Sequence, residues 1–146
     1  MGADMDLAIA LAWAANRTQG IMITLRADGR AQSSDISYSS DGPSMLISLT
    51  RDRAKTKNMQ RDPRVVLHVT DRASWSYLSF DGLVELTPLT TTIDDAVNDQ
   101  LVAYYEAVAG KPHPNWVEYR QAMVDEGRLL ARVTPTSVVG QINPGR

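Results

Sequence analysis

Closely spaced turn signals are the feature of this chain that most restricts its fold. Asp28-Gly29 favours a tight type I′ hairpin, and Ser39-Ser40-Asp41-Gly42-Pro43 has the composition of a second hairpin loop. The stretches around these turns, 20–27, 30–38 and 45–50, are short and have the composition of strands. Strands joined by such short loops pair antiparallel, so this part of the chain predicts three consecutive antiparallel strands.

The later part of the chain predicts further strands of the same sheet. Residues 65–70 form an almost continuous apolar run, which suits a buried strand. Residues 75–86 predict a long strand in which Gly82 marks a bulge or a bend. Residues 128–133 and 137–142 predict two closing strands. Because a long bent strand suits a barrel better than a flat sheet, we expect the sheet to curl.

Four helices are predicted from capping residues and apolar periodicity, at 7–16, 52–61, 93–109 and 114–127. Asp6 is suited to cap the first helix, whose apolar face must cover a larger element. That face consists of Leu7, Ile9, Leu11 and Trp13. The aromatic residues of the last helix, Trp116 and Tyr119, are interpreted as packing residues. The elements together predict one domain, residues 1–146, that is mainly β with helices (α+β): a small antiparallel barrel with helical caps.

Composition and charge limit the possible partners. The 146-residue chain has a net charge of −2, so we expect no general attraction to nucleic acid or to a membrane, and any anion site must be local. The absence of cysteine excludes disulfides, thiolate metal sites and a cysteine nucleophile, and is compatible with a reducing cytosol. Redox chemistry would therefore need a bound cofactor. The apolar run 7–15 is too short to span a bilayer and follows acidic residues, so we expect a cytoplasmic protein.

The most basic segment follows the third predicted strand. Arg53, Lys55 and Lys57 lie near the hydroxyls of Thr50 and Thr56, where the end of a strand leads into the start of a helix. The free amides and dipole of a helix start, together with a guanidinium, suit phosphate oxygens. One interpretation is a phosphate site for a cofactor, and the other is a solvated basic turn.

Two other stretches have an unusual composition. The second predicted strand is polar, with Gln32, Ser33, Ser34, Asp35 and Ser37. Either one face of this strand meets water or a ligand, or the strand lies at the edge of the sheet. The aromatic residues of Trp75-Ser76-Tyr77 could stack on a flat ring system or fill a dimer interface, and both can hold together.

The two histidines give no metal or catalytic motif. His68 falls within an apolar run, so we expect it to be a satisfied core residue, and His113 is isolated from it in the sequence. No metal site is therefore predicted. The chain has no supporting motif for Ser-His-Asp chemistry and no glycine-rich nucleotide loop, and no catalytic residue is predicted.

Several of these segments together resemble a known family. The matching residues are Gly29, Arg30, Gln32 and Ser34, then Arg53-Ala54-Lys55-Thr56-Lys57-Asn58, Arg61-Asp62-Pro63-Arg64, Trp75-Ser76-Tyr77 and Tyr119-Arg120-Gln121-Ala122-Met123-Val124. They resemble the split β-barrel flavin/deazaflavin oxidoreductases, and more narrowly the branch related to pyridoxamine 5′-phosphate oxidase that uses the deazaflavin coenzyme F420. The similarity covers nearly the whole chain.

The resemblance implies a homodimeric split antiparallel β-barrel of the FMN-binding type, with two cofactor sites at the subunit interface. It implies an F420-dependent reductase that passes a hydride from the reduced cofactor to an electron-poor small-molecule substrate, such as an enone, a quinone or a tetrapyrrole. The implied cofactor-binding residues fall into four groups. They are Arg53, Lys55, Thr56 and Asn58 at the phosphate; Ser48, Leu49 and Thr50 along the cofactor; Gln32, Ser33, Ser34 and Asp35 at the ring or ribityl portion; and Trp75, Ser76 and Tyr77, which complete the pocket from the same subunit or its partner.

Asp35 departs from the pattern of the family, in which an amide is expected more often at this position. A carboxylate there could weaken the binding of an anionic reduced ring, or it could accept a hydrogen bond from a ring N–H.

Four alternatives share the expected barrel. An FMN-dependent oxidase or reductase is the nearest, because a phosphate site cannot distinguish two phosphate-bearing tricyclic cofactors. A non-catalytic F420-binding protein is the second. A haem-binding relative is disfavoured because His68 is expected to be buried. Pyridoxamine phosphate oxidase itself is disfavoured because the strand Val138-Val139-Gly140-Gln141 lacks the Arg/His pair associated with that enzyme's substrate phosphate.

Overall fold

The computed structural model describes residues 5–144, which form four helices and seven strands. In chain order the elements are α1 (Leu7–Ala14), β1 (Gln19–Leu25), β2 (Ala31–Ser37), β3 (Ser39–Ser40), β4 (Met45–Thr50), α2 (Ala54–Arg61), β5 (Arg64–Asp71), β6 (Ser76–Leu86), α3 (Ala96–Ala109), α4 (Trp116–Asp125) and β7 (Arg128–Gln141).

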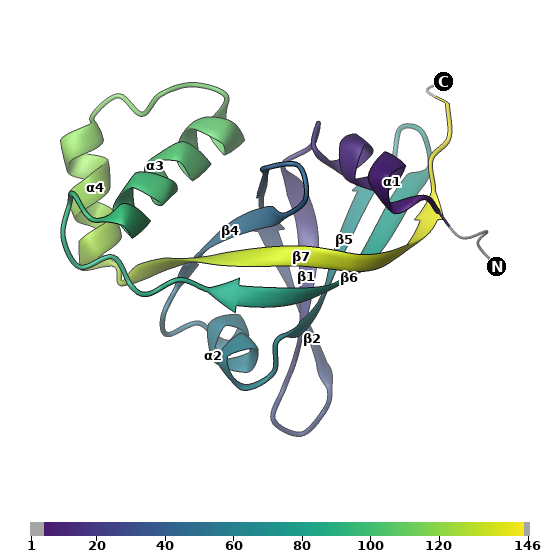
Figure 1. Cartoon of the computed structure of the whole chain (residues 1–146), viewed down its shortest axis with the longest axis horizontal. Helices are drawn as coiled ribbons and strands as arrows, with labels where there is room; N and C mark the ends of the chain where they lie inside the picture. The colour runs from purple at the N-terminus through teal and green to yellow at the C-terminus, as the bar shows by residue number, and fades with distance from the viewer. Residues whose placement is uncertain (1–4, 145–146) are drawn as a thin grey trace.

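All seven strands belong to one antiparallel sheet, which curls into an incompletely closed barrel (Figure 1). The strand order is β2-β1-β5-β6-β7-β4-β3. A single residue, Tyr38, separates β2 from β3, so the chain itself joins the two ends of the sheet. Because β2 pairs only with β1, its other side is left open toward β4. The predicted α+β fold with an antiparallel barrel is confirmed, as is the alternative that the polar second strand lies at a sheet edge.

The core of the barrel follows the two-residue period of its strands. Met45, Ile47 and Leu49 of β4 are each about 1 % exposed and point inward, as their alternation in the sequence predicts. The predicted bulge is also present, because the pairing of β6 with β7 shifts register between Asp81 and Gly82.

Helix α1 closes one end of the barrel, but not with the face that the sequence predicts. The side chain of Asp6 caps the helix by accepting a hydrogen bond from the amide of Ile9. The fully buried residues are Ala10 and Ala14, whereas Ile9 is 59 % exposed. The small alanine side chains let the helix backbone come close enough for the hydroxyl of Tyr38 to donate to the carbonyl of Ala14 at 2.7 Å.

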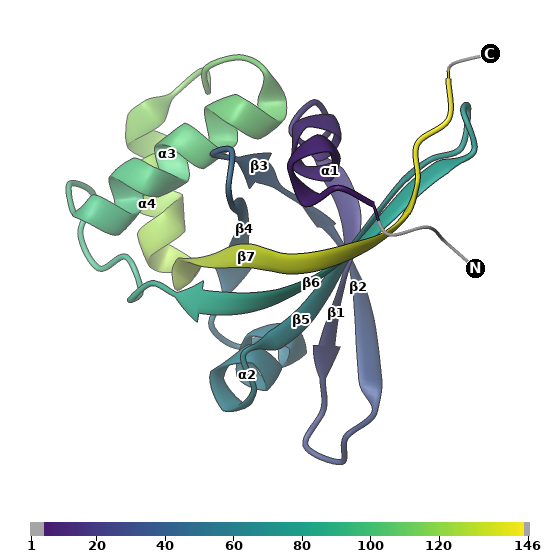
Figure 2. The ribbon, with the colours of Figure 1, turned by 45° about the vertical axis from the view of Figure 1, so that its right-hand side comes forward.

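Helices α3 and α4 pack against the outside of β4 and β7 (Figure 2). They enclose a second apolar cluster consisting of Val97, Leu101, Tyr119, Met123 and Leu130. Tyr105 and Trp116 stand edge-on to Tyr119 at 5.1 and 5.6 Å between ring centroids. Trp116 and Tyr119 therefore pack in this cluster, as the sequence predicts, and Tyr119 also borders the cleft described below.

The loops between the first strands differ from the predicted turns. The amide of Gly29 donates to the carbonyl of Arg26, and Gly29 has a φ of +88°. The type I′ turn is wrong, because it requires a positive φ at Asp28, and Trp75 is the one described non-glycine residue with a positive φ. The second loop is shorter than predicted, because Ser39 and Ser40 already pair with β4.

Two later elements also have different bounds. Helix α3 begins at Ala96 rather than at Ile93, because Asp95 occupies the cap position and accepts a hydrogen bond from the amide of Asn98. The two predicted closing strands form one continuous strand, β7. Pro135 is tolerated within it because this residue lies at the bulge, opposite Gly82, beyond the part of β7 that pairs with β4.

Candidate functional site

A cleft of about 310 Å³ opens outside the barrel, where the open side of β2 faces β4 and the start of α2. Helices α3 and α4 and the first residue of β7 complete its wall. We call it the basic cleft, and its lining residues are Asp35, Ile36, Ser37, Ile47, Ser48, Lys55, Tyr104, Tyr105, Tyr119, Met123 and Arg128.

Three cations meet at this cleft. Lys55 and Arg53 come from the start of α2, and Arg128 arrives from β7 because it pairs with Thr50 across the sheet. Burial, and then the charges of Arg53 and Arg128, lower the pKa of Lys55. Within residues 5–144 neither Arg53 nor Lys55 forms an ion pair, whereas Arg128 binds the carboxylate of Glu126 at 2.9 Å. The cluster has excess positive charge that a bound anion would neutralise.

The turn into α2 presents amides to the same place. Arg53 occupies the cap position, and no side chain caps the helix there. The hydroxyl of Thr56 donates to the carbonyl of Thr50 at 2.7 Å and fixes the angle between strand and helix. Asn58 is 6 % exposed, and its side-chain amide donates to Thr24 Oγ1 at 3.1 Å and to Gln32 Oε1 at 3.2 Å.

Through these hydrogen bonds Thr56, Asn58 and Gln32 hold the elements around the cleft together, rather than presenting their side chains to a ligand. Thr56 is fully buried, and Asn58 ties α2 to β1 and β2. Leu49 is likewise buried in the barrel core, so only its backbone can meet a ligand. Lys55, Ser48 and Asp35 are the members of the predicted set that line the basic cleft itself.

The remaining residues of the predicted set lie around the cleft or away from it. Thr50 is half-buried next to Arg128, and Arg53 is exposed at the start of α2. Ser33 is exposed and Ser34 half-buried on the open edge strand β2.

Trp75, Ser76 and Tyr77 line a different depression, of about 460 Å³, at the other end of β5 and β6. We call it the aromatic hollow, and its lining residues are His68, Thr70, Asp71, Arg72, Trp75, Ser76 and Tyr77. Ser76 is 3 % exposed, and its hydroxyl accepts hydrogen bonds from Ser74 and from the amide of Asn143. The structure therefore divides the predicted cofactor residues of one chain between two places.

The position predicted for His68 is wrong. It is half-buried on the outer face of β5, and its ring stacks on Tyr77 with 5.7 Å between the centroids. The apolar run of β5 hides this, because both faces of the strand carry apolar residues. Burial of His68 therefore gives no reason to disfavour haem.

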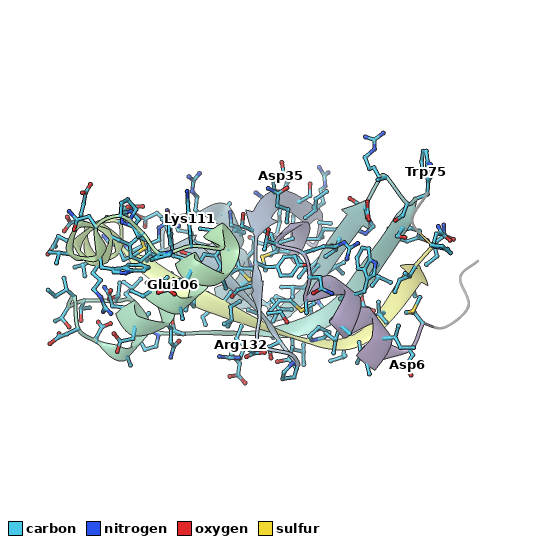
Figure 3. The ribbon with its side chains drawn as sticks, turned by 90° about the horizontal axis from the view of Figure 1, so that it is seen from above. Asp6, Asp35, Trp75, Glu106, Lys111 and Arg132 are labelled. Atoms are coloured by element: carbon cyan, nitrogen blue, oxygen red, sulfur yellow. The ribbon has the colours of Figure 1, made fainter. Side chains whose placement is uncertain are left out.

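The basic cleft and the aromatic hollow open on the same side of the molecule. Asp35 pairs with Ile21, and Ile21 pairs with His68, so the three side chains form one row across β2, β1 and β5. Two strand spacings separate Asp35 from His68, roughly 10 Å. Figure 3 shows Asp35 and Trp75 projecting from one side, with Arg132 and Asp6 on the other.

Sequence reasoning did not include the helical wall of the cleft. The hydroxyl of Tyr104 donates to the carbonyl of Ser37 at 2.8 Å, and that of Tyr119 donates to the carbonyl of Leu101 at 2.9 Å. Burial raises the pKa of Tyr104 and raises that of Tyr119 to about 12, so both hydroxyls stay neutral near pH 7. Arg128 was also absent from the predicted set. The register of β4 and β7, in which Arg128 pairs with Thr50, is the signal that would identify it.

Residues 5–144 contain neither a cluster of metal ligands nor a membrane-spanning helix. No group of three or more histidine, cysteine or acidic side chains is arranged to hold a metal ion in this part of the chain. None of its helices combines the length and the apolar character needed to cross a membrane.

Solved structures with this fold bind different cofactors. An F420 reductase is 24% identical over 92% of this chain and 97% of its own, with a TM-score of 0.62. HutZ, the haem storage protein of Vibrio cholerae, is 16% identical over 95% of this chain and 98% of its own, with a TM-score of 0.67. An FAD-binding protein of Mesorhizobium loti is 14% identical over 96% and 95%, with a TM-score of 0.67. At these identities the likeness shows the fold alone.

The sequence itself matches a family model over most of its length. The match covers residues 10–141, from within α1 to the end of β7, and so includes the whole barrel and both sites. The expected split β-barrel is confirmed. The chain belongs to the pyridoxamine 5′-phosphate oxidase family.

Proposed function

We propose that the protein is an oxidoreductase that binds the deazaflavin coenzyme F420, with the cofactor phosphate in the basic cleft, and reduces an electron-poor small molecule. The observation that carries this proposal is the cluster of Arg53, Lys55 and Arg128, in which neither Arg53 nor Lys55 has a carboxylate partner within residues 5–144. An F420 reductase among the proteins of similar fold agrees with the choice of cofactor.

The residues present fit a phosphate-bearing cofactor. Lys55 and Arg128 would hold the phosphate from inside the cleft, and Arg53 and the free amides of α2 would hold it from the outside. Asp35 would accept a hydrogen bond from a ring N–H. The bound cofactor supplies the hydride, while the side chains of the cleft bind it, orient it and exclude water.

We also propose a cytoplasmic homodimer, in which the apolar outer face of the barrel meets its copy. Two large apolar side chains on this face lie outside the aromatic hollow and are strongly exposed in the single chain, Val139 at 55% and Leu83 at 50%. They would form the contact, while Trp75 and Tyr77 remain open at the hollow. An exposed set of this kind on one face of a sheet is typical of an interaction surface. In such a dimer the aromatic hollow of the partner could also border the cofactor.

An FMN-dependent enzyme of the same fold is the second candidate. A cation cluster favours a phosphate without distinguishing F420 from FMN, and the FAD-binding protein of similar fold agrees with a flavin. A non-catalytic protein that binds F420 would use the same cleft, and turnover with an acceptor distinguishes it from an enzyme.

The test is calorimetric titration of the purified protein with F420 and, separately, with FMN. Lys55→Ala removes a charged hydrogen bond to the phosphate and should weaken binding roughly 10- to 150-fold. Lys57→Ala is the matched control, because Lys57 is exposed on the same helix and does not line the cleft. Preference for FMN would move the protein to the flavin branch. Equal effects of both variants, or no binding of either cofactor, would contradict the proposal.

A further inference from the structure

The aromatic hollow contains an imidazole that the protein itself does not use. In the described range, 5–144, neither ring nitrogen of His68 forms a hydrogen bond, and the ring contacts Tyr77 through its face. The other histidine differs, because His113 Nδ1 accepts a hydrogen bond from the amide of Asn115 at 2.9 Å. A half-exposed imidazole with two uncommitted nitrogens is available to a ligand.

The wall beside His68 is held in place before any ligand arrives. Trp75 has a φ of +58°, a conformation that bulky residues rarely adopt. Its carbonyl accepts hydrogen bonds from Gln141 Nε2 at 3.2 Å and Asn143 Nδ2 at 2.8 Å, which fix this backbone although the side chain is 63% exposed. A residue strained in this way at the edge of a depression indicates a binding role.

The chemistry of the hollow selects a flat molecule with an acceptor group. The stacked rings of His68 and Tyr77, with Trp75 beside them, suit a conjugated ring system. The imidazole can donate an N–H to a carbonyl oxygen, as can the hydroxyl of Tyr77 and the indole N–H of Trp75. Of these three donors, His68 is the one that lies in the row with Asp35 and so faces the basic cleft. Asp71 is occupied, since Arg17 binds its carboxylate at 3.0 Å.

We propose that the aromatic hollow binds the hydride acceptor, a flat conjugated carbonyl compound, and that a ring N–H of His68 donates a hydrogen bond to its carbonyl oxygen. This inference rests on the proposed function, because the row Asp35, Ile21 and His68 places the hollow next to the basic cleft on the same face. His68 is then a substrate-binding residue that polarises the carbonyl group, and the cofactor phosphate remains in the basic cleft.

The experiment uses the cofactor-free protein and the naphthoquinone menadione as probe. Binding should quench tryptophan fluorescence in a saturable manner, and Trp75→Phe should remove that signal. His68→Leu removes the N–H and should weaken menadione binding roughly 3- to 10-fold, the value of one neutral hydrogen bond. His68→Gln keeps a donor and should restore most of the affinity. His113→Gln is the control for loss of an imidazole and should leave binding unchanged.

The same variants are titrated with F420 and FMN, so that the two proposals can fail separately. The proposal is supported if His68→Leu weakens menadione binding and leaves cofactor binding unchanged. Equal weakening of both would assign the hollow to the cofactor and overturn it. A wild-type protein that binds menadione through His68 but binds neither cofactor would remove the proposed function and leave the carbonyl site standing.

Other outcomes would also overturn the inference. Haemin is the second probe, and a histidine-ligated haem spectrum that disappears in His68→Leu would assign the hollow to haem. Menadione affinity that falls as protein concentration rises, in parallel with dimer formation by sedimentation, would assign the hollow to the contact between subunits. Quenching that is absent in the wild type, or unchanged in His68→Leu, would contradict the site directly.

Discussion

The basic cleft and the aromatic hollow lie on one side of the same barrel, yet they are built differently. The cleft places cations from a helix start and from β7 beside tyrosines of α3 and α4. The hollow consists of side chains that stand on β5 and β6 and on the turn between them, without a helix over it. This difference indicates that the fold can bind a charged group where the ends of helices and strands meet, and flat rings on the outer face of its strands.

The two sites also depend on different supports. The cleft depends on hydrogen bonds such as those of Thr56 and Asn58, which hold α2 against the sheet. The hollow depends on the close approach of β6 and β7 behind it, where Gly140 lies opposite Leu78. A change behind one site should therefore leave the other intact, and this independence can be tested.

The largest effect is expected from Gly140→Ala. Gly140 has a φ of +144°, and a Cβ at this position would lie 2.1 Å from the carbonyl oxygen of Tyr77. The strand carrying Tyr77 must move, so we expect a loss of stability on the order of 3 kcal/mol and loss of menadione binding. Affinity of the folded variant for F420 or FMN should stay near the wild-type value. Chemical denaturation and the two titrations measure these quantities.

Gly29→Ala is the matched control for that substitution. Gly29 has a φ of +88°, but a Cβ there would meet no atom within 4 Å. The variant should lose only about 1 kcal/mol, the cost of a left-handed backbone without a clash. Equal destabilisation by the two substitutions would show that the approach of the strands does not matter.

The second prediction tests the cleft. Arg128→Gln removes one of the three cations and should weaken binding of the preferred cofactor about tenfold, while menadione binding is unchanged. Arg132→Gln is the control, because Arg132 lies four residues further along β7 and is paired with Asp41. Because Arg128 and Lys55 act on one anion, the loss in the double variant with Lys55→Ala should differ from the sum of the single losses. Additive losses would indicate separate roles.

The sequence predicted most of the cleft from neighbouring residues. Lys55 and Arg53 lie in one segment whose composition indicates a strand end followed by a helix, and the structure places this segment as expected. Arg128 could not be predicted, because it joins the cluster through a cross-strand pair with Thr50, 78 residues earlier in the chain. A basic motif is visible in one segment, whereas a charge that arrives from another strand requires the register of the sheet.

For the hollow, the sequence predicted the aromatic residues but not where they lie. Trp75 and Tyr77 are conspicuous in the sequence, but their distance from Asp35 in the cleft depends on the order of four strands, β2, β1, β5 and β6. His68 was expected in the core because β5 is apolar on both faces, and its outward direction follows only from the pairing with Ile21. The barrel itself was predictable because turns and alternating residues are local signals. The buried face of α1 was not predictable, because it depends on how closely the helix approaches the barrel.

The third prediction concerns the helical wall that only the cleft possesses. Asp95 caps α3, and its carboxylate accepts hydrogen bonds from Thr90 Oγ1 and from three amides. Burial opposes ionisation, but the amides of Thr91, Asn98 and Thr92 outweigh it and lower the pKa to about 2. Asp95→Ala should therefore lower the free energy of unfolding by about 1 kcal/mol near pH 7. It should weaken cofactor binding in the cleft more than menadione binding in the hollow.

The sign of the pH dependence follows from that lowered pKa. The carboxyl has a pKa of about 4 in the unfolded chain, so its contribution to stability is complete above pH 4 and is lost as the pH falls toward 2. Denaturation curves of wild type and Asp95→Ala should converge over this interval. A difference that persists at pH 2 would contradict the cap.

The smallest expected effect is a pH dependence that distinguishes the two sites. A phosphate prefers the protonated Lys55, so cofactor binding is strongest below the pKa of this lysine in the free protein and weakens as the pH rises through it. Burial, Arg53 and Arg128 lower that pKa, so a few-fold loss of affinity should begin below the ordinary value of 10.5. Lys55→Arg should abolish the loss, and Arg128→Gln should move it to higher pH because one cause of the lowered pKa is gone. Menadione binding at the hollow should show no change in Lys55→Arg, and an equal response of both ligands would mean that the cleft and the hollow act as one site.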